Sequence, residues 1–168
     1  MVSLIIAEKP QASFRIASAL SDKKPVQKKV GKVSYYELTH KNKKIIVACA
    51  VGHLYGLVEK NKEKWSYPIF DIEWQPIYKR SKQAFFSKAY LDVLNKLGKG
   101  ITTYYNGCDL DVEGELIFKN ILNHVYNKKD AKRMRFSTLT KDELIKSFEN
   151  ASPHIDFQLA EAGETRHI

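Results

Sequence analysis

Four carboxylates lie within the seven residues DLDVEGE, residues 109–115, and no cation accompanies them. The chain as a whole is basic, with a formal net charge of +9 over 168 residues. Like charges at contact distance repel one another unless a counter-ion shields them, so this acidic turn predicts a site for a divalent metal ion. An EF-hand is excluded, because the glycine and the distal glutamate of that loop are missing.

Three side chains of the acidic turn have the types and spacing of metal ligands. Asp109 should end a strand, Asp111 should lie in the turn, and Glu113 should open the next helix. Oxygen ligands without histidine or cysteine favour Mg²⁺, and Gly114 would let another backbone or a phosphate come close. The alternative is that acids simply favour a helix amino terminus. A further acid at the end of another strand, Glu8, favours the metal site.

The hydrophobic pattern predicts the strands and helices that position these residues. The predicted strands are 4–7, 33–38, 44–51, 101–108 and 133–137, and the predicted helices start at Pro10, Phe85, after Gly114, after a Thr140/Glu143 capping box, and at Asp156. Alternating strands and helices indicate an α/β fold with a central, mostly parallel sheet flanked by helices and an inserted β-hairpin. The aromatic segment 59–82 is predicted to be a loop that packs Trp65, Tyr67, Phe70 and Trp74.

Ligands of a parallel α/β sheet bind outside the carboxyl ends of its strands. Glu8 and Asp109 each follow a predicted strand. We therefore expect the two acids to meet at one edge of the sheet.

Basic residues are concentrated in two stretches. Residues 23–44 contain eight lysines against Glu37 alone, and residues 79–99 contain six bases against Asp92 alone. Such runs are commonly solvated surface. Together with an acidic turn they favour a nucleic acid bound through a metal.

No apolar run approaches the roughly 20 residues of a membrane span, so we expect a cytoplasmic protein without membrane contact. Cys49 and Cys108 lack the paired spacing of zinc sites and should be small buried residues. The chain is long enough for one domain. Arg133 and Arg135 should share one face of their strand, and His40, His124, His154 and His167 show no ligand spacing.

Several of these motifs together resemble a known family. The sequences AEKP at 7–10, GHL at 52–54 and DLDVEGE at 109–115 are similar to the Toprim domain of type IA DNA topoisomerases, especially those of archaea and the topoisomerase III group. YPIFDIEW at 67–74 is similar to the segment after GHL in archaeal members. AEAGETR at 160–166 is similar to the start of the helix that leaves the domain. The resemblance implies a Rossmann-like Toprim domain at 1–152, with 153–168 leading into the next domain.

The resemblance also implies roles for single residues. Glu8 matches an acid/base that helps to hold metal, and Lys9 matches a lysine that contacts the scissile phosphate. Asp109, Asp111 and Glu113 match the metal-binding triad, which would hold Mg²⁺ for DNA resealing. Arg166 matches an arginine close to the bound single-stranded DNA, and His53 would either contact DNA or cap its turn.

The complete family enzyme cuts one strand through a tyrosine ester, passes another strand and reseals the first. Its nucleophilic tyrosine belongs to a later domain, so this chain alone should not cleave DNA and would need the remaining topoisomerase domains. Three other hypotheses are a Toprim primase or nuclease, a recombination-mediator module with a Toprim core, and a phosphoacceptor receiver. The GHL turn argues against the first, missing zinc cysteines against the second, and the paired DxD against the third.

Overall fold

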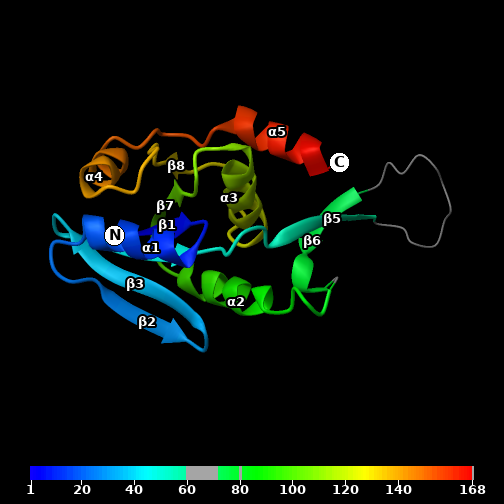
Figure 1. Ribbon diagram of the computed structural model, residues 1–168, viewed down its shortest axis with the longest axis horizontal. Coiled ribbons are helices and arrows are strands. Elements are labelled where there is room, and N and C mark those ends of the chain that lie inside the picture. The colour runs from blue at the N-terminus through cyan, green and yellow to red at the C-terminus, as the bar shows by residue number, and fades with distance from the viewer. Residues whose placement is uncertain (60–71, 80, 168) are drawn as a thin grey trace.

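A six-stranded sheet occupies the middle of the molecule in the computed structural model, which describes residues 1–59, 72–79 and 81–167 (Figure 1). Its strands, in the order β2-β3-β4-β1-β7-β8, are β1 (Val2–Ala7), β2 (Val26–Val30), β3 (Val33–His40), β4 (Lys43–Cys49), β7 (Ile101–Gly107) and β8 (Lys132–Arg133). A separate two-stranded sheet pairs β5 (Tyr55–Glu59) with β6 (Ile72–Pro76). The helices are α1 (Pro10–Leu20), the short 3₁₀ helix η1 (Ile77–Lys79), α2 (Ser87–Leu97), α3 (Val112–His124), α4 (Lys141–Glu149) and α5 (Phe157–His167).

Strands β4, β1, β7 and β8 run parallel, and β2 and β3 are antiparallel to their neighbours. The predicted α/β fold with a mostly parallel sheet and an inserted hairpin is therefore confirmed. The register aligns the carboxyl ends of the three central strands, because Ala7 pairs with both Cys49 and Gly107. The segments that follow β1, β4 and β7 consequently leave the sheet at one edge.

Strand β1 separates two hydrophobic cores because its side chains alternate between the faces of the sheet. Leu4 and Ile6 are fully buried in the core that α2 and α3 complete, whereas Ile5 and Ala7 are fully buried against α1 and α4. Burying each of the larger aliphatic side chains contributes roughly 1.5–3 kcal/mol. The sheet is thus covered on both faces, and α5 packs on α3 (Figure 1).

The lysine-rich segment before the hairpin forms a strand that the sequence pattern did not predict. All five side chains of β2 are exposed, as expected for a segment that contributes nothing to the core. An edge strand needs only backbone pairing, so it leaves no hydrophobic alternation to detect. The predicted hairpin of β3 and β4 is present, with Lys41 and Asn42 both at positive φ in its tight turn.

Three predictions for residues 133–143 were wrong: the strand at 133–137, the shared face of Arg133 and Arg135, and the Thr140/Glu143 capping box. Strand β8 has only two residues, Lys132 and Arg133. Arg133 is fully buried, whereas Arg135, beyond the strand, is exposed. The Thr140 side chain makes no cap hydrogen bond, and Glu143 accepts instead from the amide of Ser137, at 2.7 Å, which stabilises the preceding turn.

The aromatic segment is not wholly a loop, because β6 and η1 lie within it. Trp74 packs against the core beside α3, whereas Trp65, Tyr67 and Phe70 lie outside the described residues. Cys49 and Cys108 are both buried thiols, as predicted. Among the described residues, no helix has the length and apolar character needed to span a membrane.

Candidate functional site

The loops that follow β1, β4 and β7 meet at one edge of the sheet. The carbonyl oxygen of Glu8 accepts hydrogen bonds from the amides of Val51, at 2.8 Å, and Gly52, at 3.1 Å. Both residues have positive φ, 64° and 79°, and the left-handed region is strained for a β-branched residue such as Val51. Strain of this kind costs of order 1–3 kcal/mol and is typical of functional sites. This strained turn holds the two residues before His53 against the backbone of Glu8.

Glu8 and Asp109 meet, as the sequence predicted. Their carboxyl groups lie within hydrogen-bonding reach of each other. Partial burial, the hydrogen bond to Asp109 and the charges of Asp109 and Asp111 raise the pKa of Glu8 to about 7, while Lys9 opposes the shift. Helix α1, which follows β1, covers one face of the sheet, and α3, which follows β7, covers the other face. Ligands of α/β folds bind at the point where two neighbouring strands send their helices to opposite faces.

The start of α3 is built around Asp111 and Gly114. The Oδ1 atom of Asp111 caps the helix by accepting from the amide of Gly114 at 2.7 Å. A Cβ on Gly114 would lie 2.1 Å from the carbonyl oxygen of Asp109. The predicted close approach at Gly114 is therefore made by the backbone of Asp109, and Asp111 has a structural role in addition to any ligand role.

Glu115, the fourth acid of the turn, points away from the site. It is completely buried and pairs with Nε of the equally buried Arg133. Its other oxygen accepts from the amide of Asp156 at 3.2 Å. Through these two contacts, Glu115 links the first turn of α3 to β8 and to the residue that precedes α5.

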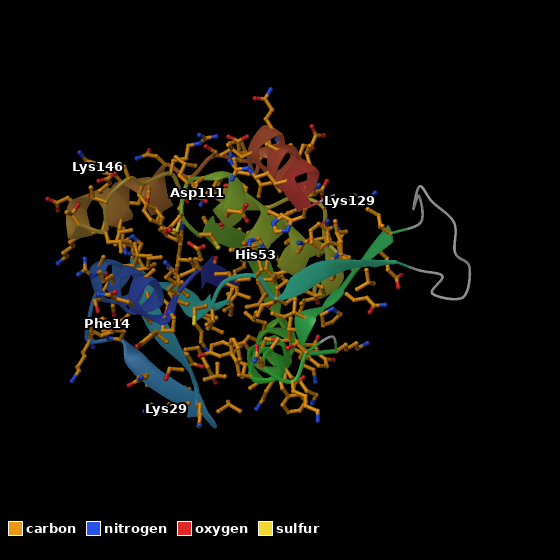
Figure 2. All side chains as sticks on the ribbon, turned by 45° about the vertical axis from the view of Figure 1, so that its right-hand side comes forward. Phe14, Lys29, His53, Asp111, Lys129 and Lys146 are labelled. Carbon is orange, nitrogen blue, oxygen red and sulfur yellow. The ribbon has the colours of Figure 1, made fainter. Side chains whose placement is uncertain are left out.

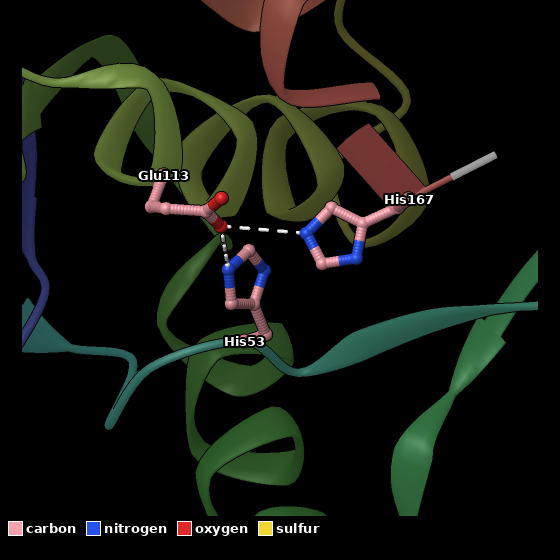
Figure 3. A group of neighbouring side chains, drawn as sticks. All are labelled: His53, Glu113 and His167. Atoms are coloured by element: carbon pink, nitrogen blue, oxygen red, sulfur yellow. Dashed lines mark hydrogen bonds and ion pairs between the residues drawn. The ribbon is translucent and has the colours of Figure 1, made fainter. Parts of the chain in front are cut away.

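Glu113 is contacted by two histidines and an arginine from two other segments, and Figure 3 shows the two histidines. Its Oε2 atom lies 2.5 Å from Nε2 of His53 and 3.4 Å from Nε2 of His167, and its Oε1 lies 3.6 Å from Nη1 of Arg166. Burial would raise the pKa of Glu113, but the hydrogen bonds from His167 and His53 lower it on balance. The structure thus places Arg166 and His53 at Glu113, and not at the Glu8–Asp109 pair.

His167 is the site residue that sequence reasoning missed. Within the described residues, the histidine cluster formed by His53, Glu113 and His167 brings three potential metal-ligand atoms within 4.8 Å of one another. The only sequence signal was that His167 directly follows Arg166. Lys9, in contrast, is exposed at the N-cap of α1, next to Glu8, as its predicted role requires.

Comparison with known proteins fits this geometry. The Toprim domain family matches residues 3–139. The chain is a member of the Toprim family. DNA topoisomerase 1 of Methanocaldococcus jannaschii is 48% identical over 100% of the chain, which spans 22% of that relative. DNA topoisomerase 1 of Pyrococcus horikoshii is 45% identical over 98% of the chain, which spans 24% of it.

A more distant relative is DNA topoisomerase 3 of Staphylococcus haemolyticus, 32% identical over 94% of the chain and 22% of its own length. The full-length topoisomerase I of Thermotoga maritima superimposes with a TM-score of 0.62 at 22% identity, over 97% of this chain and 23% of that one. This likeness shows the Toprim fold. The chain spans about a quarter of the length of these proteins.

The carboxylates that meet at the ends of β1 and β7 suit a hard divalent cation. Glu8, Asp109 and Asp111 present only oxygen atoms. Besides burial, repulsion from Asp109 and Asp111 raises the pKa of Glu8. A bound cation would relieve that repulsion, which is the usual chemistry of carboxylate sites for Mg²⁺ or Ca²⁺.

The stability of the metal-free Toprim domain should fall as the pH rises from 4.5 to about 7, because the pKa of Glu8 is raised across that window on folding. The folded protein keeps a proton there that the unfolded chain has lost. Solvent screening limits the effect to about 1 kcal/mol. Urea unfolding in EDTA at pH 5 and pH 8 should show this loss, and Glu8→Gln should abolish it. An equal loss in the Glu8→Gln variant would contradict the raised pKa.

Proposed function

We propose that this chain is the Mg²⁺-binding Toprim domain of a type IA DNA topoisomerase and that it contributes to cleaving and resealing single-stranded DNA. The observation that carries the proposal is the contact between the carboxyls of Glu8 and Asp109, which lie at the carboxyl ends of β1 and β7 in a member of the Toprim family. The similarity to proteins named DNA topoisomerase over nearly the whole chain supports the same assignment. Residues 1–152 would form the domain, and residues 153–168 would lead into the next one.

Glu8 would act as the acid/base of the reaction. In the metal-free domain, a carboxyl with a pKa of about 7 is present in both protonation states near neutral pH, which suits a group that donates a proton in one direction and accepts it in the other. It would protonate the leaving 3′ oxygen during cleavage and take that proton back during resealing.

Charged neighbours would hold the substrate and the metal. The exposed ammonium of Lys9 would donate a charge-assisted hydrogen bond to the scissile phosphate. Asp109, Asp111 and Glu113 would hold Mg²⁺, together with Glu8. When bound, Mg²⁺ supplies charge neutralisation and aligns the phosphate with the 3′ hydroxyl.

The nucleophilic tyrosine would come from another part of the complete enzyme. Burial raises the pKa of Tyr55 to about 12 and raises that of Tyr126 further. Both rings pack in or against the core, and the hydroxyl of Tyr126 donates to the carbonyl of Leu94. Such tyrosines serve packing, and we expect this chain alone to leave DNA uncut.

Replacing Asp111 with asparagine should weaken Mg²⁺ binding by roughly 10-fold or more. Asparagine is as good an N-cap as aspartate, so the change removes the charge and leaves the start of α3 intact. Isothermal titration calorimetry with MgCl₂ measures the difference. Asp92→Asn is the matched control, because Asp92 is an exposed acid paired with Lys88 on α2. Equal Mg²⁺ affinity in the Asp111→Asn variant and the control would refute the metal assignment.

Single-stranded DNA should bind with strong salt dependence and little sequence preference. The exposed lysines of the β2–β3 hairpin lie at the edge of the sheet, separated from β1 by β3 and β4 (Figure 2). If this edge follows the DNA backbone, replacing Lys29 and Lys32 by glutamine should reduce the slope of log affinity against log salt by roughly 0.7 for each lost phosphate contact. Fluorescence anisotropy measures the slope, and Lys128→Gln with Lys129→Gln is the control. An unchanged slope in the Lys29/Lys32 variant would exclude this surface, and a salt-independent affinity would exclude binding through the basic side chains altogether.

A further inference from the structure

A second kind of metal ligand set lies beside the acidic residues. His53 enters from the segment before β5, Glu113 from the first turn of α3, and His167 from the last turn of α5 (Figure 3). Nε2 of each histidine faces the same oxygen of Glu113, and the three ligand atoms lie within 4.8 Å of one another. Three elements far apart in the sequence therefore place two imidazoles and one carboxylate around one point.

The chemistry of this set differs from that of the Glu8–Asp109 pair. Imidazole nitrogen suits zinc and its neighbours in the transition series, whereas Mg²⁺ takes oxygen ligands. Two histidines and a glutamate are a known zinc ligand set, in which water takes the fourth position. Two atoms bound to one tetrahedral zinc stand about 3.3 Å apart, given bond lengths of about 2.0–2.1 Å. The spacing of the histidine cluster allows this after small side-chain rotations.

The surroundings leave room for the ion and for its fourth ligand. The side chains of His53, Glu113 and His167 are 29%, 36% and 38% exposed, so water can reach the point where they converge. Arg166 contacts the other oxygen of Glu113 and is 65% exposed, so its cation can move away into solvent. The rings of His53 and His167 lie 5.1 Å apart between centroids, and both Nε2 atoms contact Oε2 of Glu113.

We propose that His53, Glu113 and His167 form a binding site for Zn²⁺ or a similar transition-metal ion, which differs from the proposed Mg²⁺ set in its two histidines and shares Glu113 with it. Glu113 belongs to both sets, so a zinc ion held by the histidines withdraws this carboxylate from Mg²⁺ and lowers the affinity of the domain for Mg²⁺. The competition depends on the proposed function. The zinc site itself does not.

Trp74 provides a local optical probe, because its ring centroid lies 6.1 Å from that of His167. The chain has two tryptophans, so a Trp65→Phe background leaves Trp74 as the single emitter. Titrating this chain with Co²⁺, a spectroscopic substitute for zinc, should quench Trp74 emission and produce the intense visible absorption bands of tetrahedral Co²⁺. Calorimetry with ZnCl₂ alone then gives the stoichiometry, with one ion per chain expected.

Three variants decide the proposal. His167→Ala, an exposed position that should not disturb folding, should lower zinc affinity by roughly 10-fold or more. His154→Ala, which removes an exposed histidine paired with Asp130, should leave zinc affinity unchanged. Asp111→Asn should also keep zinc binding, whether or not it loses Mg²⁺, which separates this inference from the proposed function. Undiminished zinc affinity in His167→Ala, or a loss in Asp111→Asn equal to that in His167→Ala, would overturn the site.

Discussion

Replacing Arg133 with methionine should lower the free energy of unfolding by about 3–5 kcal/mol, because it leaves a buried charge without its partner. The guanidinium is completely buried against Glu115. It also donates to the carbonyl oxygens of Asn106, at 3.0 Å, Cys108, at 2.7 Å, and Asp109, at 2.8 Å. Methionine fills a similar volume but donates nothing, so these acceptors would be left in a low-dielectric interior.

Urea unfolding of the two arginine variants, Arg133→Met and Arg135→Met, tests this explanation. Arg135 lies two residues further on, with half of its side chain exposed, and its replacement should change stability by about 0.5 kcal/mol or less. Combining Arg133→Met with Glu115→Leu should recover part of the loss, because both charges are then absent. If Arg133→Met cost no more than Arg135→Met, the buried pair would not be a stabilising feature of the fold.

Replacing Gly114 with alanine should cost about 3 kcal/mol in stability, the upper end of the usual range for overpacking. The added methyl would lie 2.1 Å from the carbonyl oxygen of Asp109. The obstacle is backbone, so relief requires α3 to move away from the end of β7. That movement separates Asp111 from Asp109, and Mg²⁺ affinity should fall together with stability.

Gly31→Ala is the control for a generic loss of glycine. No atom lies within 4 Å of its added Cβ, and its φ of +61° leaves only backbone strain, which costs roughly 1–2 kcal/mol. This hairpin position should not alter Mg²⁺ affinity. Thermal unfolding and calorimetry of both variants provide the comparison, and a Gly114→Ala protein with normal Mg²⁺ binding would show that the close approach is not needed.

The meeting of Glu8 with Asp109 was predictable because it depends on two robust rules. Buried parallel strands have strongly apolar sequences, and their carboxyl ends share one edge of the sheet. Neither rule requires knowledge of side-chain conformations. The aligned pairs of Ala7 with Cys49 and with Gly107 satisfy both rules.

The different directions and partners of Glu113 and Glu115 in the acidic turn were only partly predictable. Residues Glu113 and Glu115 lie roughly 200° apart around a helix, so opposite directions could have been foreseen from their spacing. The partner of each could not. Arg133 reaches Glu115 from β8, which pairs with β7, and His167 reaches Glu113 because α5 packs back on α3. Both contacts depend on tertiary packing that leaves no local pattern.

Helix α5 is connected to the acidic turn at both of its ends. Near its start, the amide of Asp156 binds Glu115, and at its last turn Arg166 and His167 contact Glu113. Between them, Gly163 packs so closely on α3 that an added Cβ would lie 2.9 Å from the carbonyl oxygen of Val112. A tilt of α5 relative to α3 would therefore change the surroundings of two carboxylates of the acidic turn, Glu113 and Glu115, at the same time.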